Sequence, residues 1–188
     1  MDGKSSWESF CEQIQERTLD TAPLSVKSAK VLRSQILKCL TEACDNGILT
    51  TKISGLYKLL KLDEAKNHGK NIKNLMGGEL NFKRRKELAH FERFDGAWFD
   101  FGILVDETNK PAIVIGFHFE IRFLEDNPIK FLRFDLNLPD HNNQDKGKRF
   151  HIHPGSDDFM IHSPPMSPLE ILHLFLYDLY LPNRPRSS

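Results

Sequence analysis

The amino-acid sequence predicts an α+β fold: an N-terminal helical part, followed by an antiparallel β-sheet meander packed against a C-terminal helix. Apolar residues recur at helical spacing up to residue 78, alternate with polar residues beyond Phe94, and return to helical spacing after Ser167. With 188 residues, 39% of them hydrophobic, the chain is long enough to close one core. We expect a helical region (1–78), a basic connector (79–94) and a sheet with its C-terminal helix (95–188).

Up to four helices are expected in the first region. Ser6 can cap a short helix that begins at Trp7. A longer helix over 25–45 is expected to end at Asn46-Gly47, because glycine adopts the left-handed conformation of a helix stop at little cost. Leucines at helical spacing predict two more helices, over 52–62 and 64–76.

Strict alternation of apolar and polar residues predicts three strands. The turns between them, 106–111 and 125–128, are short and rich in turn-forming residues, so an antiparallel meander is the simplest connection. The polar stretch 139–147 is expected to be a loop that leads into a further strand. The alternating apolar sets are Phe99, Phe101, Ile103 and Val105; Ile113, Ile115, Phe117, Phe119, Ile121 and Phe123; and Leu132, Phe134, Leu136 and Leu138.

The clearest helix start is Ser167-Pro168-Leu169-Glu170. Serine can cap the helix, proline suits its first position, and glutamate can bond back to the cap three residues earlier. The helix is expected to lie across the apolar face of the sheet. Its apolar stripe would contain Leu169, Leu172, Leu176 and Leu179, widened by Ile171, Phe175 and Tyr180.

The opposite face of the predicted sheet carries many ionisable residues. Within the last strand His151 and His153 are separated by one residue, so both imidazoles point to the same side. Exposed sheet faces are ordinarily polar, and a solvated face explains most of these residues; the mixture of His, Asp and Arg also resembles a site. The residues of this face are Asp100, His118, Glu120, Arg122, Arg133, Asp135, Arg149, His151 and His153.

Two chemistries fit this set. In metal-free RNA cleavage, His151 and His153 would transfer protons, Arg133 and Arg149 would hold a phosphate, and Asp135 would orient a ring. In a metal centre, the two histidines and one carboxylate, such as Asp135 or Asp157, would be ligands, with water at an open position. The sequence leaves the cofactor open.

The charge distribution is compatible with a nucleic acid or an acidic partner for the N-terminal part, or with docking of the two halves on each other. Lys and Arg outnumber Asp and Glu by 16 to 10 in residues 1–86, and the ratio is reversed, 10 to 16, in residues 87–188. Nucleic-acid binding and a solvated basic face are comparable explanations. Two basic sets could contact phosphates: Lys66, Lys70 and Lys73, in a possible helix-turn-helix over 52–76, and the surface run Lys83, Arg84, Arg85 and Lys86.

Several classes are disfavoured. The sequence has no Gly-rich phosphate loop, no G-x-S-x-G elbow, no His-Glu-x-x-His motif and no zinc-ribbon cysteine spacing. No apolar stretch is typical of a signal peptide or a membrane span, and the cysteines form no disulfide framework, so we expect a cytoplasmic protein without a membrane partner.

Residues 95–180 resemble the small TumE-type toxins of prokaryotic toxin–antitoxin modules. The similarity lies in the Arg133-Phe134-Asp135 strand, the loop with His141, the His151-Ile152-His153 strand and the last helix. It implies a toxin acting on RNA or on the translation machinery, with an antitoxin partner and with Asp135, His151 and His153 at matching positions. The longer 139–150 loop and the acidic Ser156-Asp157-Asp158 depart from the family pattern.

The sequence therefore favours a toxin-like or defence ribonuclease. The alternative, from another class, is a non-catalytic adaptor that binds a nucleic acid or a protein through its basic N-terminal part.

Overall fold

The computed structural model describes residues 5–10, 13, 23–81, 83–139, 141 and 149–180. Short strand β1 (Leu24–Val26) precedes the long helix α2 (Ala29–Asp45) and the short helix α3 (Ile53–Leu59). The last described elements are α4 (Pro168–His173) and the π-helical turn that continues it, η2 (Leu174–Asp178). The strands between are β2 (Leu60–Glu64), β3 (Ile72–Gly77), β4 (Phe91–Glu92), β5 (Trp98–Asp106), β6 (Ala112–Arg122), β7 (Phe131–Leu136), β8 (Phe150–Pro154) and β9 (Ile161–His162).

Within the described residues, nine strands form one antiparallel sheet in the order β2-β3-β5-β6-β7-β8-β9. β1 pairs with β6 and β4 pairs with β5, beside this path. From β5 onward each strand pairs with the next along the chain. The predicted α+β fold with a sheet meander is confirmed.

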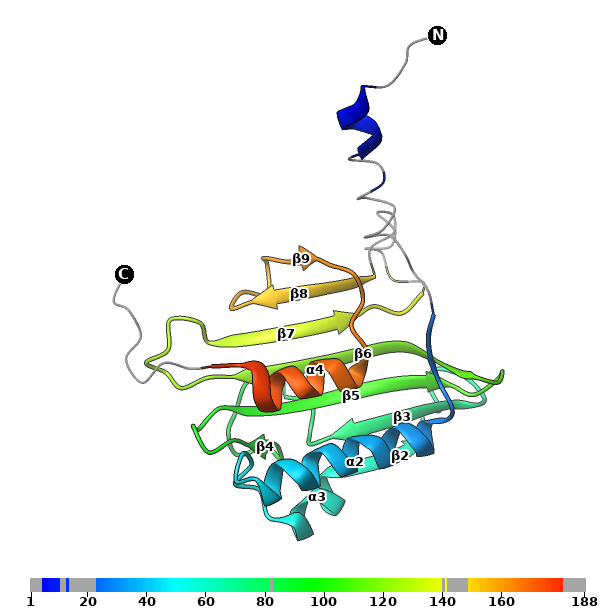
Figure 1. Ribbon diagram of the computed structural model, residues 1–188. Helices are drawn as coiled ribbons and strands as arrows, with labels where there is room; N and C mark the ends of the chain where they lie inside the picture. The colour runs from blue at the N-terminus through cyan, green and yellow to red at the C-terminus, as the bar shows by residue number, and fades with distance from the viewer. Residues whose placement is uncertain are drawn as a thin grey trace.

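Helices α2 and α4 lie on the same face of the sheet, and they bury its apolar residues (Figure 1). Phe99, Phe101, Ile103 and Val105 of β5 are fully buried there, as their alternation predicts. Phe175 of η2 packs edge-on against Phe99, with ring centroids 5.7 Å apart. The C-terminal helix therefore covers the apolar face and leaves the other face to the ionisable side chains.

The prediction of a helix over 64–76 is wrong. Residues 60–64 and 72–77 form the hairpin β2–β3, whose second strand pairs with β5 along six positions, from Ile72↔Asp106 to Gly77↔Phe101. The turn contains Gly69 and Asn71, both at positive φ, which a helix would not accept. The range 1–78 is therefore not wholly helical, and the nine-stranded sheet extends into it.

The apolar alternation of β6 changes phase at a β-bulge. Leu104 pairs with Gly116 but Val105 pairs with Val114, so Ile115 is an extra residue. Beyond the bulge the core positions are Ala112 and Val114, each 2% exposed, and not Ile113 and Ile115 as predicted. A one-residue shift sends each side chain to the other face, and an alternation count cannot reveal it.

The capping box at the start of α4 is confirmed. Ser167 Oγ accepts a hydrogen bond from the backbone N–H of Glu170, and Glu170 accepts one from the backbone N–H of Ser167. The π-helical turn that follows keeps Phe175 and Leu176 of the predicted stripe buried, whereas Tyr180, beyond the turn, is 85% exposed and does not join the stripe. Arg93, which is buried, donates to the carbonyls of Phe175 and Leu179 at the end of this turn.

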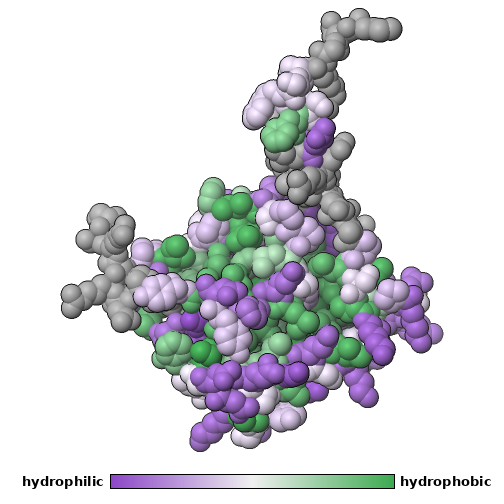
Figure 2. All heavy atoms as spheres, viewed as in Figure 1, coloured by the Kyte–Doolittle hydropathy of each residue, from purple (hydrophilic) through white to green (hydrophobic). Residues whose placement is uncertain are grey.

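The helical face of the molecule carries mixed surface chemistry. Hydrophilic side chains cover much of the part of the surface where α2 and α3 lie, with hydrophobic residues between them (Figure 2). No helix in the described ranges is long and apolar enough to cross a membrane. The expected loop over 139–147 lies outside the described residues except for Pro139 and His141, and the expected N-terminal helix is described only at residues 5–10 and 13.

Candidate functional site

The strand register gathers the ionisable side chains of the polar face into two rows that cross the sheet. In the first row, His118 on β6 is paired with Asp135 on β7, and Asp135 with His151 on β8. In the second row, Asp100 on β5 is paired with Glu120, then come Arg133 and His153. Paired residues of adjacent strands are close enough for their side chains to interact. The meander thus converts residues far apart in sequence into one cluster.

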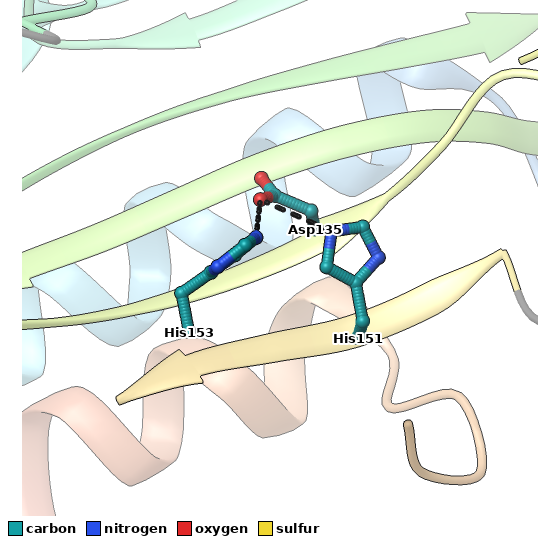
Figure 3. Close-up of side chains that lie close together, drawn as sticks. All are labelled: Asp135, His151 and His153. Atoms are coloured by element: carbon teal, nitrogen blue, oxygen red, sulfur yellow. Dashed lines mark ion pairs between the residues drawn. The ribbon is translucent and has the colours of Figure 1, made fainter. Parts of the chain in front are cut away.

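Asp135 is the centre of this cluster. Its Oδ1 accepts a hydrogen bond from His118 Nδ1 at 2.9 Å, and its Oδ2 accepts one from Arg133 Nε at 2.8 Å. His151 Nε2 and His153 Nε2 lie 3.7 and 3.6 Å from the same Oδ2 (Figure 3). Burial raises the pKa of the Asp135 carboxyl, but His118 and Arg133 outweigh burial and hold that pKa below its usual range.

Backbone carbonyls orient both rings of the His-x-His pair. His153 Nδ1 lies 3.1 Å from the carbonyl oxygen of Phe159, and His151 Nδ1 lies 3.3 Å from that of Arg149. A carbonyl oxygen can only accept, so Nδ1 is the donor in each ring and Nε2 faces Asp135. Burial lowers the pKa of His151, and the charge of Asp135 offsets this only in part. The histidines are 3% and 4% exposed.

An ion-pair network joins this cluster to the basic connector. Arg122 Nη1 donates to Asp100 at 2.6 Å and its Nε lies 2.8 Å from Glu120, and both carboxylates are fully buried. Arg84, from the connector, bonds Glu120 at 3.0 Å and Asp157 at 2.9 Å. Arg133 also pairs with Asp157. Buried charges are tolerated only when paired in this way.

Arg84 differs from the rest of the Lys83–Lys86 run. Its backbone has φ 51°, a left-handed conformation that a long side chain rarely adopts, and its guanidinium lies 3.6 Å from the centre of the Phe131 ring. Lys83, Arg85 and Lys86 are exposed, as predicted for this run. The turn therefore directs a single arginine back onto the polar face of the sheet.

A pocket of about 720 Å³ opens on this face. It is lined by three histidines, His68, His118 and His141, together with Arg84 and Arg133. Neither His151 nor His153, both described residues, lines it; they lie beside Asp135, on the neighbouring strand β8. Asp135 and Asp157 belong to the lining, together with Asn74, Leu80, Gly102, Leu104, Gly116, Phe117, Leu136, Asn137 and Leu138.

The structure brings most, but not all, of the predicted catalytic residues together. Asp135, Arg133, His151 and His153 form one cluster. Arg149 does not join it, because its guanidinium donates to the backbone carbonyls of Asn137 and Ile115. Those hydrogen bonds occupy the guanidinium N–H groups that were expected to bind a phosphate.

The predicted helix-turn-helix is absent from the described residues, because 60–64 and 72–77 are strands. Lys66, Lys70 and Lys73 instead line a shallow hollow of about 510 Å³ on the β2–β3 hairpin, with Glu64, Gly69 and Asn71. Lys73 is ion-paired with Glu64. The same turn contributes His68 to the larger pocket, so the hollow and the pocket adjoin along the chain.

Sequence reasoning missed the role of His118 and the position of His68. Alternation does assign His118 to the polar face, but only the register with β7 makes it the partner of Asp135. His68 stands alone among polar residues in the sequence, and it reaches the pocket because the predicted helix is a hairpin. The pairing of β3 with β5 is a long-range contact, and the local periodicity of the sequence does not predict it.

Comparisons with protein-family models, with curated proteins and with solved structures found no match to this chain. The resemblance to TumE-type toxins therefore stays a prediction. The fold and the site define an α+β protein with a histidine–carboxylate–arginine pocket on the open face of an antiparallel sheet. Such a set can transfer protons and bind a phosphate group.

Proposed function

We propose that this protein is a toxin-like ribonuclease that cleaves RNA in the pocket on the polar face of its sheet. The observation that supports this proposal most is the meeting of His68, His118 and His141 with Arg84 and Arg133 in one pocket of about 720 Å³. Metal-free RNA cleavage needs a base, an acid and a cation at the phosphate.

His118 is the proposed general base, since its Nδ1 is bonded to Asp135 and its ring lines the pocket. A carboxylate at Nδ1 fixes the tautomer, so the lone pair of the neutral ring lies on the other nitrogen. The base would take the proton of a ribose 2′-hydroxyl, whose oxygen forms a bond to the adjacent phosphorus. The bond from phosphorus to the 5′-oxygen then breaks, and His68 or His141 would give that oxygen a proton.

Arg84 and Arg133 are the proposed phosphate ligands. Both are bonded to Asp157, whose side chain is 54% exposed on the turn after β8. A phosphate oxygen could replace this carboxylate between the two guanidinium groups, because both anions accept the same planar fork. Glu120 would stay bonded to Arg122 during this exchange.

The lysines of the β2–β3 hairpin suit the approach of an RNA strand. Lys66 and Lys70 lie in the turn that also carries His68, and Lys73 follows it on β3, so the backbone of a bound strand would meet positive charge before it reaches the pocket. A toxin of this kind would require an antitoxin or another protein partner that covers the pocket.

The test is a cleavage assay on end-labelled RNA and on DNA of the same sequence, with purified protein. We expect RNA to be cut and DNA to remain intact, because DNA lacks the 2′-hydroxyl. His118→Gln should slow cleavage about 10²- to 10⁴-fold, the usual contribution of a general base. His173→Ala is the matched control, since His173 is exposed and pairs with Asp178 outside the pocket.

Two results would contradict the proposal: equal cutting of DNA, or full activity in folded His118→Gln protein. The second candidate function, a non-catalytic adaptor, is favoured by the lysine-lined hollow alone. It predicts RNA binding without cleavage, and binding that weakens with salt and with charge reversal at Lys66 and Lys70.

A further inference from the structure

We propose that Asp135, His151 and His153 bind one divalent transition-metal ion, of the zinc or iron(II) class, next to the pocket. This inference goes beyond the ribonuclease proposal, which needs no metal, and it does not rest on it. Each of the three residues offers one ligand atom, and these atoms all lie within 4.8 Å of one another. Among the described residues, they form a histidine–histidine–carboxylate set.

The distances within this set are close to those that a metal requires. Asp135 Oδ2 lies 3.6 Å from His153 Nε2 and 3.7 Å from His151 Nε2. Two ligands bound at about 2.1 Å in a tetrahedral site are about 3.4 Å apart. Small rotamer adjustments would therefore bring both nitrogens and the oxygen onto one ion. The two rings rise from β8 toward the carboxylate on β7 (Figure 3).

The hydrogen bonds of the imidazoles already have the pattern of metal-bound histidine. Nδ1 of each ring points to a backbone carbonyl, that of Phe159 for His153 and that of Arg149 for His151. This leaves the lone pair of a neutral ring on Nε2, directed at a carboxylate oxygen. Two lone pairs facing an anion repel it, whereas a cation between them would bind all three groups.

Hydrogen bonds hold the Asp135 carboxylate in place, as they usually do for carboxylates that bind a metal. His118 is bonded to Oδ1, and Arg133 donates to Oδ2. An ionised carboxylate oxygen can accept more than one partner, so the bond from Arg133 leaves Oδ2 able to bind an ion. Arg133 is ion-paired with both Asp157 and Glu120, which partly neutralise its positive charge. Its guanidinium therefore repels a metal ion less than an unpaired guanidinium would.

The ligand chemistry favours borderline metals over calcium and magnesium. Two imidazole nitrogens and one carboxylate are typical of catalytic zinc and of non-haem iron(II), whereas hard cations prefer oxygen ligands alone. Of the three residues, Asp135 is the one that lines the pocket. The Asp135 carboxylate would thus bind the ion while it stays hydrogen-bonded to His118.

The test uses the full chain, freed of metal with a chelator and then titrated with Zn²⁺ against a chromophoric competitor. We expect one tightly bound Zn²⁺ per chain and no comparable binding of Mg²⁺. His153→Ala should weaken Zn²⁺ binding by at least about 100-fold, the upper range for loss of a supporting residue. His173→Ala should bind Zn²⁺ as the wild type does, since its ring lies outside this cluster.

A second measurement covers the case in which His153→Ala fails to fold. Co²⁺ added to the wild-type apoprotein should give the visible absorption of a four- or five-coordinate site, and rising Zn²⁺ should raise the melting temperature. Wild-type protein that binds no Zn²⁺ and gives no such Co²⁺ spectrum would overturn the proposal, as would unchanged Zn²⁺ affinity in His153→Ala. RNA is absent from these measurements, so their failure and failure of the ribonuclease proposal are distinguishable.

Discussion

Asp157 holds the place between Arg84 and Arg133 that a phosphate is proposed to take. The bond from Arg84 is the main reason that the pKa of Asp157 lies below its usual range, so this carboxylate is charged at neutral pH. It therefore competes with an incoming anion for both guanidinium groups. At the scale of single residues, the proposed phosphate position in the pocket is occupied by the carboxylate of Asp157.

Removing this carboxylate should improve phosphate binding. We expect Asp157→Ala to bind inorganic phosphate roughly fivefold more tightly than wild type, corresponding to the loss of a competing surface pair worth about 1 kcal/mol. Asp158→Ala is the control, because Asp158 is an exposed neighbour whose backbone N–H donates to Ser156 Oγ. Isothermal titration calorimetry measures both; equal or weaker phosphate binding by Asp157→Ala would argue against the exchange.

Arg122 should matter most for stability among the charged residues of the polar face. It is 2% exposed and pairs with Asp100 and Glu120, both fully buried. We expect Arg122→Met to lower the free energy of unfolding by about 3–5 kcal/mol, because Asp100 would remain as a buried charge without its partner. Arg85→Ala, at an exposed position, should change it by less than about 0.5 kcal/mol. Urea denaturation followed by circular dichroism compares the two, and a neutral Arg122→Met would contradict the network's structural role.

At the scale of elements, the pairing of β3 with β5 requires glycine at position 77, because the Phe101 ring of β5 lies against the Gly77 backbone. A Cβ atom there would lie 2.2 Å from the Phe101 ring, which is fully buried. We expect Gly77→Ala to cost about 1–3 kcal/mol through overpacking. In α3, Gly55→Ala meets only Thr51 at 3.5 Å and should instead stabilise by about 0.5–1 kcal/mol, as alanine does in helices. Thermal unfolding should show a lower melting temperature for Gly77→Ala and a higher one for Gly55→Ala than for the wild type.

The capping box of α4 gives a stability contribution that depends on pH. The backbone hydrogen bond from Ser167 lowers the pKa of Glu170 in the folded chain. Because the folded pKa is below the unfolded one, the contribution is complete above the usual range of a glutamate and is lost as pH falls through the lowered pKa. The stability difference between wild type and Glu170→Gln should therefore shrink on acidification. A difference that stays constant from neutral pH to pH 3 would contradict this reasoning.

The elements that sequence predicts well are those whose local preferences agree with their tertiary surroundings. The alternation from Phe99 to Val105 gives both the strand β5 and its core face, and Ser167 to Glu170 gives the start of α4. The hairpin β2–β3 was missed, since its leucines also fit helical spacing and pairing with β5 decides the outcome. The bulge at Ile115 and the φ of Arg84 depend on single backbone angles that no pattern encodes.

At the scale of the whole molecule, the sheet separates stability from chemistry. Helices α2 and α4 bury one face, and the connector with its Arg84 covers part of the other, where the pocket lies over β5, β6 and β7. Sequence alternation places Asp135, His151 and His153 on this polar face, but it does not show that Asp135 lines the pocket and that the two histidines do not. It also could not anticipate Arg149, which bonds to backbone carbonyls instead of the site.

The most direct test of the central claim, that the polar face of the sheet is where RNA binds, is the response of the histidine rings to a nucleoside 3′-monophosphate. Two-dimensional NMR resolves the imidazole signals of the 8 histidines in one titration. We predict that the signals of His68, His118 and His141, which line the pocket, shift together with a single dissociation constant. A saturating titration that leaves these three unchanged, or that moves only the exposed His173, would contradict the account.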